Sequence, residues 1–243
     1  MPNVVWVTGA GSGIGEAMAR AFAAKGHAVA LTARTRDALD AVATAIAEET
    51  PGARTLICAG DVTDRRRMDD IARDVAVWGN GLHILCNNAG LNIPRRRWDE
   101  LDTDADWDDW NAVVDINIKG AMNVIAAALP IMRAQKRGQM IHTSSWAGRH
   151  HSAVSGAIYG ASKHALCDLS ASLNDQEGAY GIRSTALCPA EVATPLMTRR
   201  PGYDPAKAAA MIQPEDMAQT ALYVAAMNPG VAVHEVVLAP VRP

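Results

Sequence analysis

Short runs rich in β-branched residues alternate with longer segments of helical periodicity along almost the whole chain. Strands are predicted at residues 4–8, 28–33, 54–59, 82–86, 139–143, 182–188 and 233–238. Helices are predicted at residues 14–24, 37–49, 64–77, 106–132, 156–179 and 214–227. Strands that alternate with helices usually pair in parallel and carry helices on both faces. The sequence therefore predicts an α/β fold, a doubly wound parallel sheet of about seven strands.

The composition fits one folded domain without a basic surface. Hydrophobic residues make up 49% of the 243 residues and charged residues 20%, as in an ordinary globular protein. A single domain over residues 1–243 is expected. The formal net charge of -3 gives no broad positive field. We therefore expect a small-molecule substrate and no nucleic acid partner.

Three features of the sequence indicate where in the cell the protein is found. Cys58, Cys86, Cys167 and Cys188 form no CxxC pair, which favours free thiols in a reducing cytoplasm and no metal site. The N-terminal residues pass directly into a predicted strand, without the features of a signal peptide. The longest apolar run, residues 124–132, is shorter than the roughly 20 residues that span a bilayer. We expect a soluble, cytoplasmic protein with no membrane partner.

Residues 190–213 lack the periodicity of the rest of the chain. They mix Pro195, Pro201, Gly202 and Pro205 with short apolar pieces. Because irregular segments of this length are usually functional or disordered, we expect a mobile lid that covers a substrate. The alternative is an inert surface loop.

A glycine-rich turn follows the first predicted strand and leads directly into a helix. It reads Thr8-Gly9-Ala10-Gly11-Ser12-Gly13-Ile14-Gly15, a TGxxxGxG spacing. Glycines let the backbone approach a pyrophosphate closely, and the N-terminus of the following helix offers unpaired N–H groups to it. The turn therefore predicts a dinucleotide site, with a merely flexible strand-to-helix turn as the alternative.

The end of the second predicted strand bears on the choice of cofactor. An acidic residue there would hydrogen-bond an adenosine ribose, whereas a basic residue would bind a 2′-phosphate. The chain has Ala33-Arg34, and a guanidinium suits bidentate phosphate contact. We expect NADP(H), with NAD(H) as the alternative, because Arg34 could instead be solvated beside Arg36.

Tyr159 and Lys163 lie four residues apart on a predicted helix and so share one face. A tyrosine with a pKa near 10 is a poor acid at neutral pH, and lowering that pKa by about 3 units takes roughly 4 kcal/mol. One ammonium at about 4 Å supplies that much at an effective dielectric of about 20. We therefore expect Lys163 to acidify Tyr159. Taken alone, the pair could also be a surface contact.

Polar residues follow two further predicted strands at the edge where open α/β sheets bind ligands. Ser144 and Ser145 come directly after residues 139–143 and could hydrogen-bond a substrate oxygen or simply form a turn. Asn87-Asn88-Ala89-Gly90 comes after residues 82–86 and could be either a tight turn or part of a cofactor wall.

Taken in this order, the motifs resemble the short-chain dehydrogenase/reductase family over nearly the whole chain. The family's glycine motif matches residues 8–15, its adenine-contacting Asp matches Asp61 followed by Val62, and its NNAG motif matches residues 87–90. Its catalytic Asn matches Asn117 within the run DINIKG, its Ser matches Ser145, and its YxxxK pair matches Tyr159 and Lys163. The resemblance implies a Rossmann fold, nucleotide binding and oxidoreductase activity.

The resemblance also implies roles for these residues. Tyr159 would donate a proton to the carbonyl oxygen during reduction, Ser145 would orient that oxygen, and Lys163 would hold the nicotinamide ribose. Asn117 would anchor a water through which Tyr159 is reprotonated. Further cofactor contacts would come from Asn88, Ala89, Gly90, Pro189, Val192 and Thr194. The long helices over residues 106–132 and 156–179 would pair across subunits in a homodimer or homotetramer.

Three features depart from the family pattern. One residue more than usual separates Ser145 from Tyr159, so Ser144 is a rival for the serine role. Pro189 is followed by Ala190 and not by glycine, which restricts the backbone beside the nicotinamide. The C-terminus lacks the usual G...DGG ending and is similar to the branch that includes hydroxy-acid dehydrogenases and clavulanic-aldehyde-type reductases.

The family lines its substrate pocket at positions that here hold Trp146, His150, His151 and Met197. These residues favour a small, partly apolar substrate, with ordinary packing or solvation as the alternative. Arg95-Arg96-Arg97 is expected to be a solvated loop face, although an anionic substrate could use it. The sequence therefore predicts NADP(H)-dependent hydride transfer between a carbonyl and a secondary alcohol. The rival hypotheses are an NAD-dependent dehydrogenase and a non-catalytic dinucleotide sensor.

Overall fold

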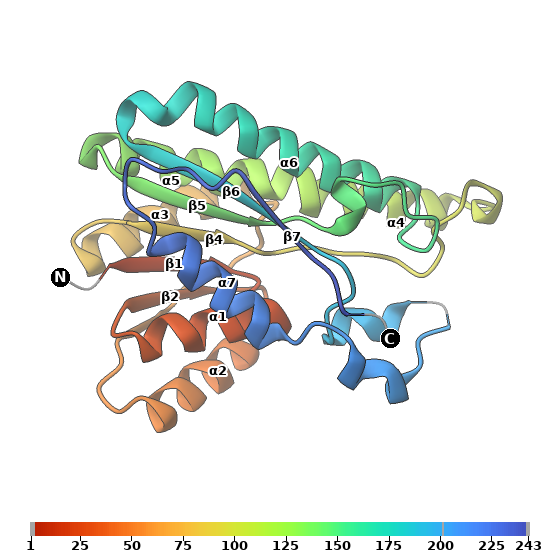
Figure 1. Cartoon of the computed structure of the whole chain (residues 1–243), viewed down its shortest axis with the longest axis horizontal. Coiled ribbons are helices and arrows are strands. Elements are labelled where there is room, and N and C mark those ends of the chain that lie inside the picture. The colour runs from red at the N-terminus through yellow and green to blue at the C-terminus, as the bar shows by residue number, and fades with distance from the viewer. Residues whose placement is uncertain (1–2, 201, 242–243) are drawn as a thin grey trace.

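The computed structural model describes residues 3–200 and 202–241 and arranges seven parallel strands there in one sheet (Figure 1). The strands are β1 (Val4–Thr8), β2 (Ala28–Thr32), β3 (Thr55–Ile57), β4 (Ile84–Asn87), β5 (Gly138–Thr143), β6 (Ile182–Pro189) and β7 (Glu235–Leu238). Their order across the sheet is β3-β2-β1-β4-β5-β6-β7. Each strand overlaps a predicted one, and the predicted doubly wound α/β fold is confirmed.

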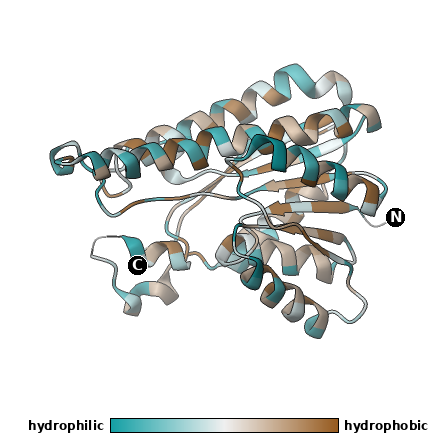
Figure 2. Cartoon of the chain, turned by 180° about the vertical axis from the view of Figure 1, so that it is seen from behind, coloured by the Kyte–Doolittle hydropathy of each residue, from teal (hydrophilic) through white to brown (hydrophobic). Residues whose placement is uncertain are grey.

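Helices cover both faces of this sheet, as Figure 1 shows. Helices α1 (Gly13–Ala24), α2 (Arg36–Glu49) and α7 (Pro214–Ala225) lie on one face, and α3 (Arg65–Gly79), α5 (Ala121–Gln135) and α6 (Ala157–Glu177) on the other. Side chains alternate along β1, so Val5 packs with Phe22 of α1 while Trp6 packs with Met68 of α3. Figure 2 shows hydrophobic residues along the strands and hydrophilic ones on the outer turns of the helices. The sheet thus has two apolar layers, one against each set of helices.

The long helix predicted over residues 106–132 is continuous but changes its pitch in the middle. It consists of α4 (Asp104–Val114), a π-helical turn (Asp115–Gly120) and α5. Such turns insert an extra residue into a helix and are frequent at functional sites. Here the turn carries Asn117, whose side chain faces the protein interior.

This same helix corrects the expectation about apolar runs. Its 32 residues, Asp104–Gln135, are long and apolar enough to cross a membrane by length and composition alone. In the fold, however, Val124, Ala128 and Met132 are buried in the apolar layer that α3 and α5 form against the sheet. The segment is therefore a core helix.

The strand order places the functional cleft. The chain runs outward from β1 to β2 and β3, then returns to the other side of β1 and continues through β4 to β7. Ligands of such sheets bind where the order reverses, beyond the carboxyl ends of the strands. Residues 190–213 lie beyond the end of β6 and contain two short helical turns, Pro195–Arg199 and Pro205–Ala210, which their composition did not predict. A backbone bridge between Val192 and Ile212 holds the two ends of this segment together.

Candidate active site

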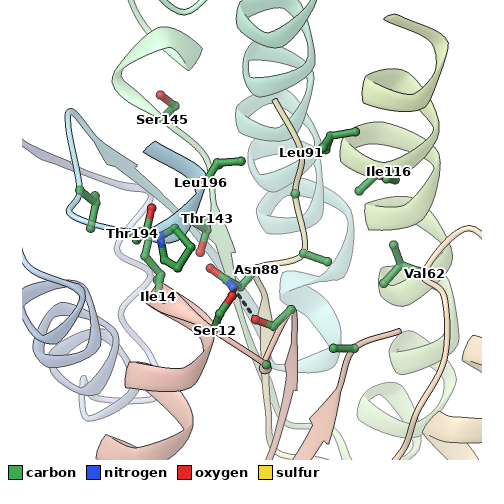
Figure 3. Close-up of a pocket in the computed structure, with 18 of the residues that line it drawn as sticks. Ser12, Ile14, Val62, Asn88, Leu91, Ile116, Thr143, Ser145, Thr194 and Leu196 are labelled. Atoms are coloured by element: carbon green, nitrogen blue, oxygen red, sulfur yellow. Dashed lines mark hydrogen bonds between the residues drawn. The ribbon is translucent and has the colours of Figure 1, made fainter. Parts of the chain in front are cut away.

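A cavity of about 430 Å³ lies at the carboxyl ends of the strands, with walls from the loops that follow β1 to β6 (Figure 3). Most of the predicted site residues line it. They are Gly9, Gly11, Ser12, Gly13, Ile14, Arg34, Asp61, Val62, Asn88, Ala89, Gly90, Ser145, Tyr159, Lys163, Pro189, Val192, Thr194 and Met197. Residues from both ends of the chain therefore meet around one space.

The glycine turn after β1 has the backbone shape that its spacing predicts. Gly9 and Gly13 have φ values of 65° and 57°, in the left-handed region that favours glycine. A Cβ at Gly13 would lie 3.1 Å from Cγ2 of Thr194, and one at Gly9 would lie 3.0 Å from the Cα of Ala89. The turn and the first residues of α1 form a close-walled cradle that a side chain would fill, which fits a pyrophosphate.

Thr8 connects this cradle to the NNAG turn. Its hydroxyl accepts hydrogen bonds from the backbone N–H groups of Asn88 and Ala89, at 3.1 and 3.2 Å, and lies 3.4 Å from Oδ1 of Asn87. Gly15 lies behind the turn, where a Cβ would come within 2.2 Å of the carbonyl oxygen of Gly9. Thr8 and Gly15 do not line the cavity and so support its walls.

The part of the cleft that follows β2 carries one basic residue. Arg34 lines the cavity, is exposed, and makes no ion pair with any residue in 3–200 or 202–241. Arg36 faces away and pairs with Asp40 at 3.2 Å. The carboxylate of Asp61 accepts two hydrogen bonds from Thr63, from its backbone N–H and from its hydroxyl, both at 2.9 Å. The loop that presents Asp61 is therefore ordered by its own side chains.

The side chain of Asn117 is hydrogen-bonded to the loop after β4 and to α6. Its Oδ1 accepts a hydrogen bond from the Leu91 N–H at 2.7 Å, and its Nδ2 donates to the Leu91 carbonyl at 2.9 Å and to Oγ of Ser162 at 3.0 Å. A Cβ on Gly90 would lie 3.5 Å from Oδ1 of Asn117 and 3.4 Å from Nζ of Lys163. Asn117 and Lys163 thus flank Gly90, although Asn117 does not itself line the cavity.

Lys163 is buried beneath the cleft. Only 3% of the residue is exposed, and its Nζ donates a hydrogen bond of 2.8 Å to the carbonyl of Thr143 at the end of β5. Burial lowers the pKa of Lys163 to about 8. Burial, together with the nearby Lys163 ammonium, lowers the pKa of His142 to about 4, so His142 is neutral at physiological pH.

Tyr159 lies one helical turn before Lys163 on α6, and its half-buried side chain lines the cavity. Burial raises the pKa of Tyr159 above its usual value, and the groups that oppose this rise are the Ser145 hydroxyl and the Arg96 guanidinium. Nζ of Lys163 is 5.5 Å from the centre of the Tyr159 ring and is bonded to Thr143. The expectation that Lys163 acidifies Tyr159 is therefore wrong for this structure.

The two serines after β5 point to different partners. The Ser145 hydroxyl accepts a hydrogen bond of 3.1 Å from the Ala147 N–H and interacts with the Tyr159 phenol. The Ser144 hydroxyl donates to the backbone carbonyl of Lys163 at 2.9 Å and contacts Sγ of Cys167 at 3.1 Å. Ser144 is thus engaged beneath α6, while Ser145 is on the side of the phenol.

The predicted substrate pocket is only partly reproduced. Met197 lines the cavity, whereas Trp146, His150 and His151 do not. The Trp146 and His150 rings pack on each other with centroids 4.6 Å apart, so their contact is local. Apolar wall residues that the sequence analysis missed are Ala38, Leu91, Ile116 and Leu196. Several of them lie next to predicted site residues in the sequence, and this proximity is the signal that could have identified them.

Comparison with known proteins agrees with this arrangement. Residues 3–203 match the model of the short chain dehydrogenase family. The chain is 32% identical over 239 residues to an uncharacterized oxidoreductase of Staphylococcus aureus, covering 98% of this chain and 97% of the relative.

Two crystallised enzymes have similar structures. Levodione reductase superposes with a TM-score of 0.87 at 27% identity, covering 97% of this chain and 95% of the other. An alcohol dehydrogenase of the archaeon Thermococcus sibiricus, complexed with 5-hydroxy-NADP, also gives 0.87, at 26% identity and covering 100% and 99% of the two chains. The chain therefore belongs to the short-chain dehydrogenase/reductase family, as an oxidoreductase of the NAD(P)-dependent class.

Proposed function

We propose that the protein is an NADP(H)-dependent carbonyl reductase or secondary-alcohol dehydrogenase in which Tyr159 is the general acid and base. The observation that carries this proposal is the position of Tyr159. It lines the same cavity as the glycine cradle at Gly9 and Gly13, with Ser145 and Lys163 beside it. A cradle shaped for phosphates and a proton donor at opposite ends of one cleft are what hydride transfer to a carbonyl requires.

The chain's own residues divide the work as follows. When bound, the nicotinamide supplies the hydride for reduction and accepts it for oxidation. Tyr159 donates its phenolic proton to the substrate oxygen in reduction and takes it back in oxidation, while the Ser145 hydroxyl orients that oxygen. Lys163, fixed by the Thr143 carbonyl, would hold the ribose of the bound cofactor. Asn117 would anchor the path by which Tyr159 regains its proton. The residues that would face the nicotinamide are Pro189, Val192 and Thr194.

Burial raises the pKa of the Tyr159 phenol, so Tyr159 holds its proton at neutral pH. The protonated phenol is the form that reduction of a carbonyl requires, whereas oxidation of an alcohol requires the phenolate.

NADP(H) is the proposed cofactor. Its support is Arg34, an exposed guanidinium at the adenosine end of the cavity without an ion-pair partner in residues 3–200 and 202–241. The 5-hydroxy-NADP complex of the archaeal alcohol dehydrogenase is consistent with that choice. NAD(H) is the rival cofactor.

The substrate is proposed to be small and partly apolar, because Leu91, Leu196 and Met197 line the cavity with Tyr159. Membership of the branch with hydroxy-acid dehydrogenases and clavulanic-aldehyde-type reductases remains part of this proposal. So do a cytoplasmic location, assembly as a homodimer or homotetramer, and a covering role for residues 190–213.

A direct test uses the wild-type protein with a panel of ketones, aldehydes and secondary alcohols, followed by the nicotinamide absorbance. Oxidation of NADPH by at least one carbonyl, with slower or no reaction with NADH, is expected. Silence across the panel while NADPH binds would instead support a dinucleotide sensor without catalysis.

A further inference from the structure

The three consecutive arginines after β4 do not form one solvated face. Arg95 and Arg97 are exposed, with 53% and 66% of their side chains accessible, and pair with Asp106 and Asp99 at 2.7 Å. Arg96 is buried, with 7% of the residue accessible, and has no carboxylate within ion-pair distance in residues 3–200 and 202–241. The expectation of a solvated run is thus wrong for Arg96. Buried guanidinium groups are rare unless they are well bonded.

Backbone carbonyls from three segments satisfy the Arg96 guanidinium. Its Nε donates to the carbonyl of Ile93 in its own loop, and its Nη1 donates at 2.9 Å to the carbonyl of Val154, in the loop before α6. Its Nη2 donates at 3.3 Å to the carbonyl of Arg199, in the 190–213 segment. Arg96 thereby bridges segments 58 and 103 residues away in the chain.

The backbone of Arg96 also contacts the start of α6. Its carbonyl accepts a hydrogen bond of 3.2 Å from the N–H of Ala157, the first residue of that helix. Gly156 has a φ of 87°, and a Cβ there would lie 2.5 Å from Cβ of Arg96. The helix therefore begins directly against Arg96, only two residues before Tyr159.

The charged groups around this contact are few and fixed. The Ser145 hydroxyl and the Arg96 guanidinium both lower the pKa of the Tyr159 phenol against the effect of burial, and Nζ of Lys163 lies 5.5 Å from the centre of its ring. The pKa of Arg96 is lowered by burial and by Arg200, and it is raised by Tyr159 and Glu100. The Glu100 carboxylate accepts hydrogen bonds from the backbone N–H groups of Arg96 and Arg97 and does not bond the guanidinium. Burial lowers the pKa of Arg96, but an arginine stays protonated in a protein.

We propose that Arg96 is a positioning residue, which ties the 190–213 segment to the start of α6 and keeps a permanent positive charge at the start of this helix, which carries Tyr159. The planar fork of a guanidinium can reach three carbonyls at once, which an ammonium on a flexible stem cannot reproduce. The tie, which is the set of hydrogen bonds from Arg96 to the carbonyls of Val154 and Arg199, is a property of the fold. Its effect on catalysis rests on the proposed function. Arg96→Met removes both tie and charge, whereas Arg96→Lys keeps the charge and loses the fork.

Two measurements on the whole protein test this without any substrate. Limited trypsin digestion, with fragments identified by mass, reports how often the 190–213 segment opens at the Arg199–Arg200 bond. Ultraviolet absorbance of phenolate against pH, with Tyr159→Phe in each background for subtraction, reports the ionisation of Tyr159. Arg95→Gln and Arg97→Gln are the matched controls, because both side chains are exposed neighbours of Arg96.

We expect Arg96→Met to speed cleavage after Arg199 about tenfold, from loss of one charge-assisted hydrogen bond, and to move the Tyr159 titration upward by about one pH unit. Arg96→Lys should speed cleavage and leave the titration near that of the wild type. The controls should change neither. If Arg96→Met does not fold, the two Arg96→Lys results decide.

A rate of cleavage after Arg199 that is unchanged in Arg96→Met would overturn the proposal that Arg96 holds the segment. If Arg96→Met does not fold, an unchanged rate in Arg96→Lys would do so. A Tyr159 titration that is unchanged in Arg96→Met, or that moves upward by about one pH unit in Arg96→Lys, would overturn the role of the charge. Because neither readout needs turnover, a protein that gives the expected shifts but reduces no carbonyl would contradict the proposed function alone.

Discussion

The side-chain amide of Asn117 donates a hydrogen bond of 3.0 Å to the Ser162 hydroxyl, which itself donates at 2.7 Å to the backbone carbonyl of Tyr159. A π-helical turn on one helix is thereby linked to the turn of α6 that carries Tyr159 and Lys163. Because the remaining bonds of Asn117 go to Leu91, one side chain joins the π-helical turn, the loop after β4 and the first turns of α6.

Replacing Asn117 with Ala should loosen this link. The change leaves the Leu91 N–H and carbonyl without their partner, and we expect the free energy of unfolding to fall by about 2 kcal/mol. Turnover should fall more than NADPH affinity, because the hydrogen bonds of the Asn117 side chain go to Leu91 and Ser162 and not to the cradle at Gly9 and Gly13. Urea melts, fluorescence titration and steady-state rates measure the three quantities. Equal losses of binding and turnover would argue against a role at the catalytic end.

The glycine cradle offers a matched pair of substitutions. Gly13 and Gly26 both have left-handed φ values, 57° and 79°, so Ala costs each about 1 kcal/mol of stability. A Cβ at Gly13 meets Thr194 at 3.1 Å, whereas one at Gly26 has nothing within 4 Å. Gly13→Ala should therefore weaken NADPH binding and Gly26→Ala should not. Calorimetric titration of both variants checks this, and equal affinities would rule the cradle out as the phosphate site.

Arg34 is the residue on which cofactor choice depends. Arg34→Ser should raise the Kd for NADPH by about 10- to 100-fold, the value of a charge-assisted contact, and leave the Kd for NADH nearly unchanged. Arg36→Ser is the control, because Arg36 pairs with Asp40. Fluorescence titration with both reduced cofactors decides, and equal effects of Arg34→Ser on the two would disprove 2′-phosphate recognition.

Lys163 should make stability depend on pH in a defined window. Burial lowers its pKa from 10.5 to about 8, so between these values the unfolded chain binds more protons than the folded protein does. The contribution of Lys163 to stability is therefore full above pH 10.5 and is lost as the pH falls to about 8. Relative to Lys163→Met, the wild type should gain about 3 kcal/mol across that window.

Guanidinium melts of both proteins at the two ends of the window measure this gain. Lys119→Met, at an exposed site on the π-helical turn, is the control for the loss of one lysine side chain. A wild-type minus Lys163→Met difference that is constant with pH would mean that the Lys163 ammonium is better solvated than its burial indicates.

Local patterns were enough to predict the frame of the site. The residues of β1 are all buried, and their nearly continuous apolar run predicted both the first and the last residue of this strand. The conformation at Gly9 and Gly13 was predictable because a positive φ favours glycine, so the residue type itself indicates the backbone conformation. Strand alternation then placed the loops after β1, β4 and β5 on one edge, where the cavity is found.

Features that depend on distant contacts could not be predicted in the same way. Arg96 looked solvated because the carbonyls that hold it belong to residues 154 and 199, far along the chain. The direction of the Tyr159 pKa shift was missed because its cause, burial of the phenol, is set by packing and not by the spacing of Tyr159 and Lys163. Likewise, Trp146 and His150 pack on each other and do not line the cavity, which the resemblance to the family's pocket positions could not reveal.

The most direct measurement is the single-turnover rate of Tyr159→Phe, with NADPH affinity determined on the same preparation. The side chain loses only its hydroxyl, so the cavity and the glycine cradle keep their shape. We predict that the rate of carbonyl reduction falls by at least about a thousandfold, as for loss of a general acid, while the Kd for NADPH changes less than about threefold. A variant that reduces the carbonyl at the wild-type rate would contradict the assignment of Tyr159 as the proton donor.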